Sequence, residues 1–336
     1  MLKNLLITGG VGFIGINAIE EFLLNSEFEQ IIIIDDLKFG QKPKDISIFN
    51  NIKIIFIKGD INDSKLLLNL LRNFNISHIV HLAAESHVDE SIINPEKFIT
   101  TNILGTFNLL ESFKKYWLEN GMPESWRFLY ISTDEVFGSI SEYEEPFNEN
   151  SLHNPSSPYS ASKSSGEQLV KAWYKTYKLP VIIINSTNNY GPYQYADKLI
   201  PVVIKSILKG QNIPVYGNGE NIRDWIYVKD NCAAIRMTLL NGHIGNSYCV
   251  GAESTISNIE LIKIICSKID SLPTLKVKVP SFSMVKFIKD RPGHDFKYSI
   301  KNNKIKEEIG WAPKYNLNKG LTETIKWFLR NKKWLF

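Results

Sequence analysis

The chain has 336 residues, 43% of them hydrophobic, which is enough to bury a sizeable core as one large unit or two closely joined domains. The net charge is only +4 and the basic residues are spread along the chain, which argues against a nucleic acid or a membrane surface as partner. The three cysteines form no CxxC pair and the N-terminus has no signal-peptide pattern, so we expect a cytoplasmic protein with reduced thiols and no metal site.

Short, nearly continuous apolar runs alternate with amphipathic segments over the first half of the chain. Runs without clean alternation are typical of strands that are buried on both faces of a parallel sheet. Strand–helix alternation favours right-handed βαβ units, so we predict an α/β fold with a doubly wound, mostly parallel Rossmann-type sheet. The predicted strands cover residues 5–8, 31–35, 52–57, 78–84, 127–133 and 181–186, and the predicted helices cover 13–24, 65–73, 106–118 and 162–177.

The character of the chain changes after about residue 187, where glycine and proline become denser and the strand signals shorten. We therefore predict a Rossmann domain over residues 1–187 and a smaller α+β substrate-binding region over residues 188–336. A predicted helix at about 229–241 is expected to return to the first domain, so that the two domains are interleaved.

A glycine-rich turn follows the first predicted strand. Gly9, Gly12 and Gly15 keep a G-x-x-G-x-x-G spacing where this turn opens the first helix. Positions without side chains let the backbone approach a pyrophosphate, whose charge then lies at the helix N-terminus. Asp35 ends the second strand 20 residues after Gly15, where its carboxylate can accept hydrogen bonds from an adenosine ribose and would repel a 2′-phosphate. The first domain is therefore predicted to bind NAD rather than NADP.

Other residues near the turn complete the predicted cofactor site. An ordinary loop aspartate remains the alternative for Asp60, and small core residues are common at positions like those of the two alanines. The predicted contacts are Phe13 and Ile14 at the start of the first helix, Asp60 and Ile61 after the third strand, where they could meet the adenine, and Ala83 and Ala84 at the end of the fourth strand.

A tyrosine and a lysine then follow at helical spacing. Tyr159 and Lys163 are four residues apart, which places them on one face of a helix. A nearby cation, together with the charge of the nicotinamide, stabilises a phenolate and lowers the pKa of Tyr159. A phenolate can take the proton of a sugar hydroxyl while its carbon gives a hydride to NAD. The spacing alone is a weak signal, but it becomes a strong one beside the glycine-rich turn.

The fifth predicted strand ends in Thr133, Asp134 and Glu135. Open α/β sheets bind ligands at the carboxyl ends of their strands. Two carboxyl groups in different environments can act as the acid and the base that remove water from a substrate. A turn with two surface acids is the alternative.

Eight segments of the chain together resemble the dTDP-glucose 4,6-dehydratases of the extended short-chain dehydrogenase/reductase superfamily, in order and essentially from end to end. The resemblance is most specific at the TDE run after the fifth predicted strand and at DRPGHD near the C-terminus. The segments are TGGVGFIG, HLAAESHVDESI, TNILGT, ISTDEVFG, SPYSASK, NNYGPYQYADKLIP, YGNGENIRDWIYVKD and DRPGHD.

The resemblance implies a lyase that oxidises C4 of a nucleoside-diphosphate glucose with NAD, eliminates water across C5 and C6, and returns the hydride to C6. Tyr159 is then the base at C4, Lys163 tunes it and binds the nicotinamide ribose, and Thr133 hydrogen-bonds near the C4 oxygen. Asp134 protonates the leaving group and Glu135 takes the C5 proton. Family members are usually homodimers, here through helices near 96–118 and 159–177. The implied substrate contacts are Ser86, Asn189, Lys198, Leu199, Tyr216, Arg223, Arg291 and His294.

Three positions depart from the family pattern. Cys249 stands where asparagine is usual, which is expected to weaken a polar contact to the nucleotide and leaves thymine and uracil both open. Phe137 replaces a tyrosine and is expected only to pack, and Glu90 replaces an arginine near the site. The alternative functions are a nucleotide-sugar 4-epimerase or UDP-glucuronate decarboxylase, which needs no Asp–Glu pair, and a catalytically silent protein that binds NAD or RNA, which would typically lack the Tyr or the Lys.

Overall fold

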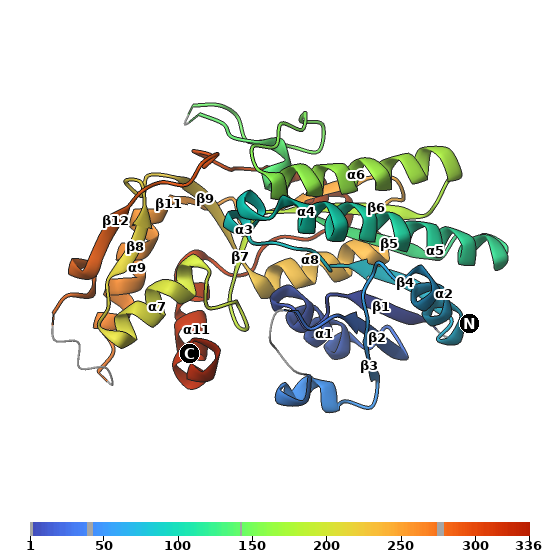
Figure 1. Ribbon diagram of the computed structural model, residues 1–336, viewed down its shortest axis with the longest axis horizontal. Coiled ribbons are helices and arrows are strands. Elements are labelled where there is room, and N and C mark those ends of the chain that lie inside the picture. The colour runs from blue at the N-terminus through green and yellow to red at the C-terminus, as the bar shows by residue number, and fades with distance from the viewer. Residues whose placement is uncertain (1–2, 39–42, 142, 274–278) are drawn as a thin grey trace.

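The computed structural model describes residues 3–38, 43–141, 143–273 and 279–336, and at its centre is a seven-stranded sheet (Figure 1). All neighbouring strands of this sheet run parallel, which confirms the predicted fold class. In spatial order the strands are β3 (Ile54–Lys58), β2 (Gln30–Asp35), β1 (Asn4–Thr8), β4 (Ile76–His81), β5 (Arg127–Thr133), β6 (Val181–Ser186) and β10 (Ser247–Val250).

Helices cover both faces of the sheet, because the strands carry apolar side chains on both sides. Every residue of β1, β4 and β6 is buried. The apolar faces of the helices complete two separate cores, one on each side of the sheet. One core contains α1 (Phe13–Asn25) and α8 (Val228–Asn241), and the other contains α2 (Ser64–Asn73), α5 (Thr106–Glu119) and α6 (Pro158–Tyr177).

The chain crosses from one half of the sheet to the other between β3 and β4. Strand β1 therefore has β2 on one side and β4 on the other, and ligands of such sheets bind at the carboxyl ends of these central strands. Gly9 follows β1 with a φ of +69°, and a Cβ there would lie 2.7 Å from the backbone of Ala83. Only glycine allows the loops after β1 and β4 to approach so closely.

Residues after 187 mainly form a smaller α+β region, seen at the left of Figure 1. The apolar faces of three of its helices pack together in its core. A three-stranded sheet contains β11 (Thr255–Ser257), β9 (Ile222–Tyr227) and β7 (Asn188–Tyr190), and a two-stranded sheet contains β12 (Val285–Ile288) and β8 (Ile213–Tyr216). The helices are α7 (Leu199–Lys209), α9 (Asn258–Asp270), α10 (Asn303–Ile309) and α11 (Leu317–Arg330).

The chain returns twice from this region to the first one. Helix α8 packs on α1, and β10 pairs with β6 as the seventh strand of the large sheet. The sequence predicts the first of these returns but not the second, because the four residues of β10 are too short to distinguish from a strand of the smaller region. The division at residue 187 remains a prediction.

The start of α6 is the boundary that matters most for the site. The helix begins at Pro158, four residues before the predicted start, because Ser157 accepts a hydrogen bond from the backbone N–H of Ser160 and caps it. Proline suits the first helical position, where its missing N–H is not needed. Tyr159 and Lys163 therefore belong to one rigid helix.

Helix α5 runs beside α6 (Figure 1). It is preceded by α3 (Val88–Ile93) and α4 (Pro95–Phe98), and a π-helical segment, Ile99–Gly105, joins α4 to α5. In the described part of the chain, no helix is both long and apolar enough to cross a membrane.

Candidate active site

A cavity of about 940 Å³ lies between the carboxyl edge of the parallel sheet and the smaller region. Its size suits a large ligand or two ligands held end to end. Every residue that the sequence predicts for the site lines this cavity. The cofactor set is Gly9, Gly12, Phe13, Ile14, Gly15, Asp35, Asp60, Ile61, Ala83 and Ala84; the catalytic set is Thr133, Asp134, Glu135, Tyr159 and Lys163; and the substrate set is Ser86, Asn189, Lys198, Leu199, Tyr216, Arg223, Arg291 and His294.

The glycine-rich turn forms a cradle that a dinucleotide fits. A Cβ on Gly15 would lie 2.4 Å from the carbonyl oxygen of Gly9, so the turn closes only without that side chain. Helix α1 begins at Phe13, with Gly12 as an N-cap residue that makes no side-chain cap. The N-terminus of such a helix favours an anion. Asp35 already accepts hydrogen bonds from the backbone N–H groups of Val11 (3.0 Å) and Leu37 (2.9 Å). A carboxylate has further lone pairs, so this does not prevent a ribose contact.

The Thr133–Asp134–Glu135 segment turns sharply at the end of β5. The hydroxyl of Thr133 accepts a hydrogen bond from the N–H of Glu135 at 3.3 Å and donates one to the Asp134 carboxylate at 3.2 Å. Residues Asp134–Phe137 form a 3₁₀ turn, which directs both acidic side chains toward the cavity. The two carboxyl groups are thus adjacent in sequence but lie in different surroundings.

Those surroundings separate the two acids. Burial raises the pKa of Asp134 well above its ordinary value, and the charges of Glu135 and Asp224 add to the effect. Burial also raises the pKa of Glu135, but the positive charges of Arg291 and Arg223 oppose it. Asp134 is therefore the better proton donor and Glu135 the better base.

Lys163 is almost fully buried beneath the cavity. Its ammonium donates a hydrogen bond to the carbonyl oxygen of Ile131 at 2.7 Å and lies 4.3 Å from the ring centroid of Tyr130. Burial lowers the pKa of Lys163 to about 7, although the carboxylate of Glu167 opposes the shift. The Lys163 ammonium therefore loses its proton more easily than that of an exposed lysine.

The protein's own groups do not lower the pKa of Tyr159 as the sequence led us to expect. Burial raises it, the charges of Glu135 and Asp134 raise it further, and only the hydrogen bond with Thr133 opposes them. The physical reason is that the ammonium of Lys163 is directed at the backbone of Ile131, whereas two acids face the phenol. Tyr159 is therefore a neutral phenol in the protein alone.

A Lys163→Met variant is expected to be more stable than the parent protein at pH 7, by on the order of 2 kcal/mol, when no cofactor is bound. The pKa of Lys163 is about 7 in the folded protein and far higher in the unfolded chain, so the unfolded state binds more protons between those values. The parent should gain stability relative to the variant as pH rises above about 7. Urea unfolding at pH 7 and pH 10 tests this, and an equal difference at both values would contradict it.

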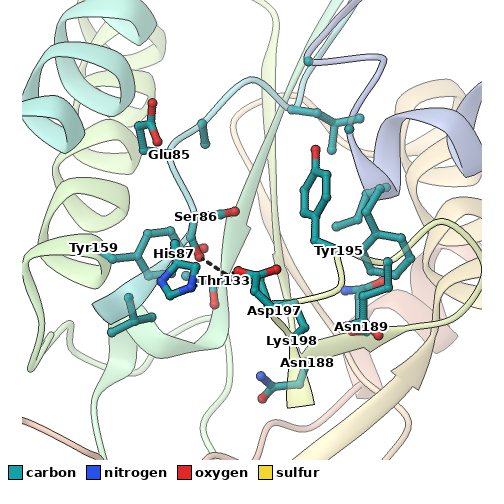
Figure 2. A pocket seen from close by; sticks show the side chains of 18 of the residues that line it. Glu85, Ser86, His87, Thr133, Tyr159, Asn188, Asn189, Tyr195, Asp197 and Lys198 are labelled. Carbon is teal, nitrogen blue, oxygen red and sulfur yellow. Dashed lines mark hydrogen bonds and ion pairs between the residues drawn. The ribbon is translucent and has the colours of Figure 1, made fainter. Parts of the chain in front are cut away.

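The loop after β4 ties the two sides of the cavity together. His87 Nε2 lies 2.9 Å from a carboxylate oxygen of Asp197, as the dashed line in Figure 2 shows. The Lys198 ammonium donates to the carbonyl oxygen of Ser86 at 3.4 Å. Asp89 accepts a hydrogen bond from the Tyr216 hydroxyl at 3.0 Å and pairs with Arg291 at 3.4 Å. Three of the residues predicted to bind the substrate, Lys198, Tyr216 and Arg291, are thus held by the loop 86–89.

Three buried polar atoms of residues that line the cavity lack hydrogen-bond partners. They are Arg291 Nε, Asn189 Oδ1 and Gln194 Oε1. Such atoms are costly unless a ligand satisfies them. The guanidinium of Arg223 is partly used, because it donates to the carbonyl oxygens of Ile222, Phe296 and Asp295. Arg223 therefore has fewer N–H groups left for a phosphate than the sequence predicts. Arg291 has more left than Arg223, because its buried Nε has no partner.

The comparisons with known proteins decide the family. A sequence model of the GDP-mannose 4,6 dehydratase family matches residues 6–324. A dTDP-glucose 4,6-dehydratase of Haemophilus influenzae is 42% identical over 98% of this chain and 99% of its own length. The chain belongs to the dTDP-glucose 4,6-dehydratase family.

Solved structures of such dehydratases have the same fold. The Bacillus anthracis enzyme in complex with NAD is 36% identical with a TM-score of 0.87, and the match covers 99% of this chain and 98% of that one. The DesIV dTDP-glucose 4,6-dehydratase of Streptomyces venezuelae, also with NAD bound, is 35% identical with a TM-score of 0.88 and 98% coverage of both chains. The predicted family, enzyme class and cofactor are confirmed.

The departures of this dehydratase from the family pattern lie outside the cavity. Cys249 is fully buried beside Val136, Phe137 and Ile300, and its side chain packs in a small apolar core. The expected loss of a polar contact to the nucleotide stays a prediction. Phe137 packs in that same core, as expected. Glu90 forms an exposed ion pair with Lys97 at 2.9 Å.

Some residues of the dehydratase site escape sequence reasoning. Glu167 is fully buried, accepts a hydrogen bond from Asn185 at 2.6 Å, and lies one helical turn after Lys163. That spacing from Lys163 was the available signal. Asp89 and Asp197 gave none, because their partners are distant in sequence. Within the described residues, no cluster of His, Cys, Asp and Glu could hold a metal ion.

Proposed function

We propose that this protein removes water from dTDP-glucose and forms the 4-keto-6-deoxy sugar, with NAD as a resident cofactor. One observation carries the proposal: Asp134 and Glu135 lie in the cavity with Tyr159, and their surroundings separate their proton affinities. An epimerase or a decarboxylase of the same fold would need Tyr159 but not this pair of acids. The NAD-bound dehydratases of similar structure support the same assignment.

The proposed reaction divides its proton transfers among three side chains. NAD supplies the hydride acceptor for C4, the hydride donor for C6, and a positive charge that favours the phenolate. Tyr159, hydrogen-bonded to Thr133, takes the proton of the C4 hydroxyl. The resulting ketone makes the C5 proton acidic, and Glu135 removes it. Asp134 protonates the C6 oxygen, which leaves as water, and Glu135 returns its proton to C5.

The substrate end of the cavity would hold the nucleoside diphosphate. Arg291 and Lys198 supply positive charge for its phosphates, since both line the cavity and both act on the charge of Glu135. Tyr216 and Asn189 lie beside them. Binding would satisfy the buried Nε of Arg291 and the Oδ1 of Asn189.

Parallel incubation with dTDP-glucose and UDP-glucose tests the function. The 4-keto-6-deoxy product is detected by its absorbance after alkali treatment, and we expect it from dTDP-glucose. Product from UDP-glucose alone would correct the base and keep the reaction. Failure with both sugars, or inversion at C4 without loss of water, would contradict the dehydratase assignment.

We further propose a homodimer that pairs α5 and α6 with the same helices of a second copy. Apolar side chains are exposed along this face: Ile99 by 52%, Leu104 by 50% and Phe107 by 39%.

A cytoplasmic location suits the three cysteines, which are free and buried.

A Leu104→Glu/Phe107→Glu variant is expected to be a monomer, because it places two charges in the apolar contact. Sedimentation velocity of the variant and the parent measures the change. Leu152→Glu is the matched control, since Leu152 is 87% exposed on another segment and should not affect association. A parent protein that sediments as a monomer would contradict the proposal.

A further inference from the structure

Tyr195 reaches the glycine-rich turn from the other side of the cavity. It belongs to the segment between β7 and α7, and its side chain points toward the start of α1 in Figure 2. Its hydroxyl oxygen lies 3.5 Å from where a Cβ on Gly12 would be. The backbone N–H of Phe13, in the first turn of α1, hydrogen-bonds to it. No sequence signal pointed to this residue.

The segment that carries Tyr195 is fastened to α1 by other contacts. The side-chain amide of Asn17 donates a hydrogen bond to the carbonyl oxygen of Pro192 at 3.0 Å. The hydroxyl of Tyr193 donates to the Glu20 carboxylate at 3.3 Å. These contacts hold the backbone of the segment against α1, so its position does not depend on the hydroxyl of Tyr195.

The chemistry of the Tyr195 hydroxyl suits a phosphate. Burial raises its pKa, and the charges of Asp35 and Asp197 raise it further, so it stays a neutral phenol at physiological pH. Its oxygen lies at the N-terminus of α1, where an anion bound to the glycine-rich turn would come close to it. A phenol whose oxygen accepts from an N–H group can still donate its own hydrogen. A phosphate oxygen of a dinucleotide bound at the glycine-rich turn would be the acceptor for that hydrogen.

We propose that Tyr195 retains the cofactor, because its hydroxyl donates a hydrogen bond to the pyrophosphate of NAD. The inference rests on the proposed function, in which the hydride taken from C4 returns to C6. The reduced cofactor must then stay in the site throughout one turnover. A hydroxyl supplied by the segment 188–199, which also carries Asn189 and Lys198, would join cofactor retention to the side of the cavity that binds the sugar nucleotide.

The test compares Tyr195→Phe with Tyr193→Phe. Both variants remove one hydroxyl from the same segment, but only Tyr195 reaches the glycine-rich turn. The dissociation constant of NAD is measured by titration calorimetry on cofactor-free protein, and its release rate by stopped-flow fluorescence, both without sugar. Tyr195→Phe is expected to bind NAD about tenfold more weakly, with most of the change in the release rate, because a hydrogen bond to a charged group is lost. Tyr193→Phe should match the parent protein.

Two outcomes would overturn the inference: unchanged NAD release in Tyr195→Phe, or an equal increase in both variants, which would mean that docking of the segment rather than this hydroxyl is responsible. Thermal unfolding of each variant verifies that it is folded. The dTDP-glucose assay of the parent protein tests the proposed function separately. A parent that binds NAD but makes no product contradicts only that function, whereas a parent that binds no NAD contradicts both.

Discussion

A Tyr159→Phe variant should lose C4 oxidation, with kcat lower by about three orders of magnitude and NAD affinity nearly unchanged. Tyr159 lines the cavity, hydrogen-bonds to Thr133 and feels the charges of Glu135 and Asp134. Phenylalanine keeps the ring, including its edge contact with Phe98 at 6.3 Å between centroids, so the packing of α6 should be retained.

The measurement separates chemistry from binding. Single-turnover mixing with dTDP-glucose should show no reduced cofactor in Tyr159→Phe, while calorimetry shows NAD bound. Tyr130→Phe is the matched control, because its buried hydroxyl donates to the backbone carbonyl of Lys163 at 3.4 Å and Tyr130 does not line the cavity. Parent-like oxidation in Tyr159→Phe would mean that another group is the base.

A Glu135→Gln variant should stop the reaction one step later. Its ketone would still form, because Tyr159 and Thr133 are unchanged, but the C5 proton would have no base. We expect reduced cofactor to accumulate on the enzyme to nearly one equivalent, with product formation slower by about two to four orders of magnitude. The absorbance of the reduced nicotinamide after rapid mixing measures this directly.

The Asp134→Asn variant is the comparison for Glu135→Gln. It removes the buried proton donor but keeps the base, so exchange of the C5 proton with solvent should continue while loss of the C6 hydroxyl slows. In deuterated water, Glu135→Gln should show little exchange of the C5 proton, because the base is missing. Normal turnover of Glu135→Gln would contradict the role assigned to this carboxylate.

Much of the fold was predictable, because its signals are local. Strands β5 and β6 begin and end where their apolar runs predict. The apolar pattern alone predicts that α6 starts at residue 162, but the helix begins four residues earlier, where Ser157 caps it and Pro158 occupies its first position. Strand β10 could not be predicted, since its place in the sheet depends on pairing with β6, some sixty residues earlier.

The location of the candidate site was predictable, but not the protonation of its groups. Motif spacing and the family resemblance indicated residues that all line one cavity. The protonation of Tyr159 was not, because it depends on which way the Lys163 ammonium points. The ties of Asp89 to Tyr216 and Arg291, and the position of Tyr195, arise from segments far apart in the chain and have no local signature.

The late arrival of β10 has a consequence for synthesis on the ribosome. Until residues 247–250 emerge, β6 is the outermost strand of a growing sheet, and its free edge can pair with other chains. A truncated protein that ends at residue 187 would therefore be prone to aggregate, even though it contains the glycine-rich turn and Tyr159. The nascent polypeptide can therefore complete the large sheet only after residues 188–246, which belong mainly to the smaller region, have been translated.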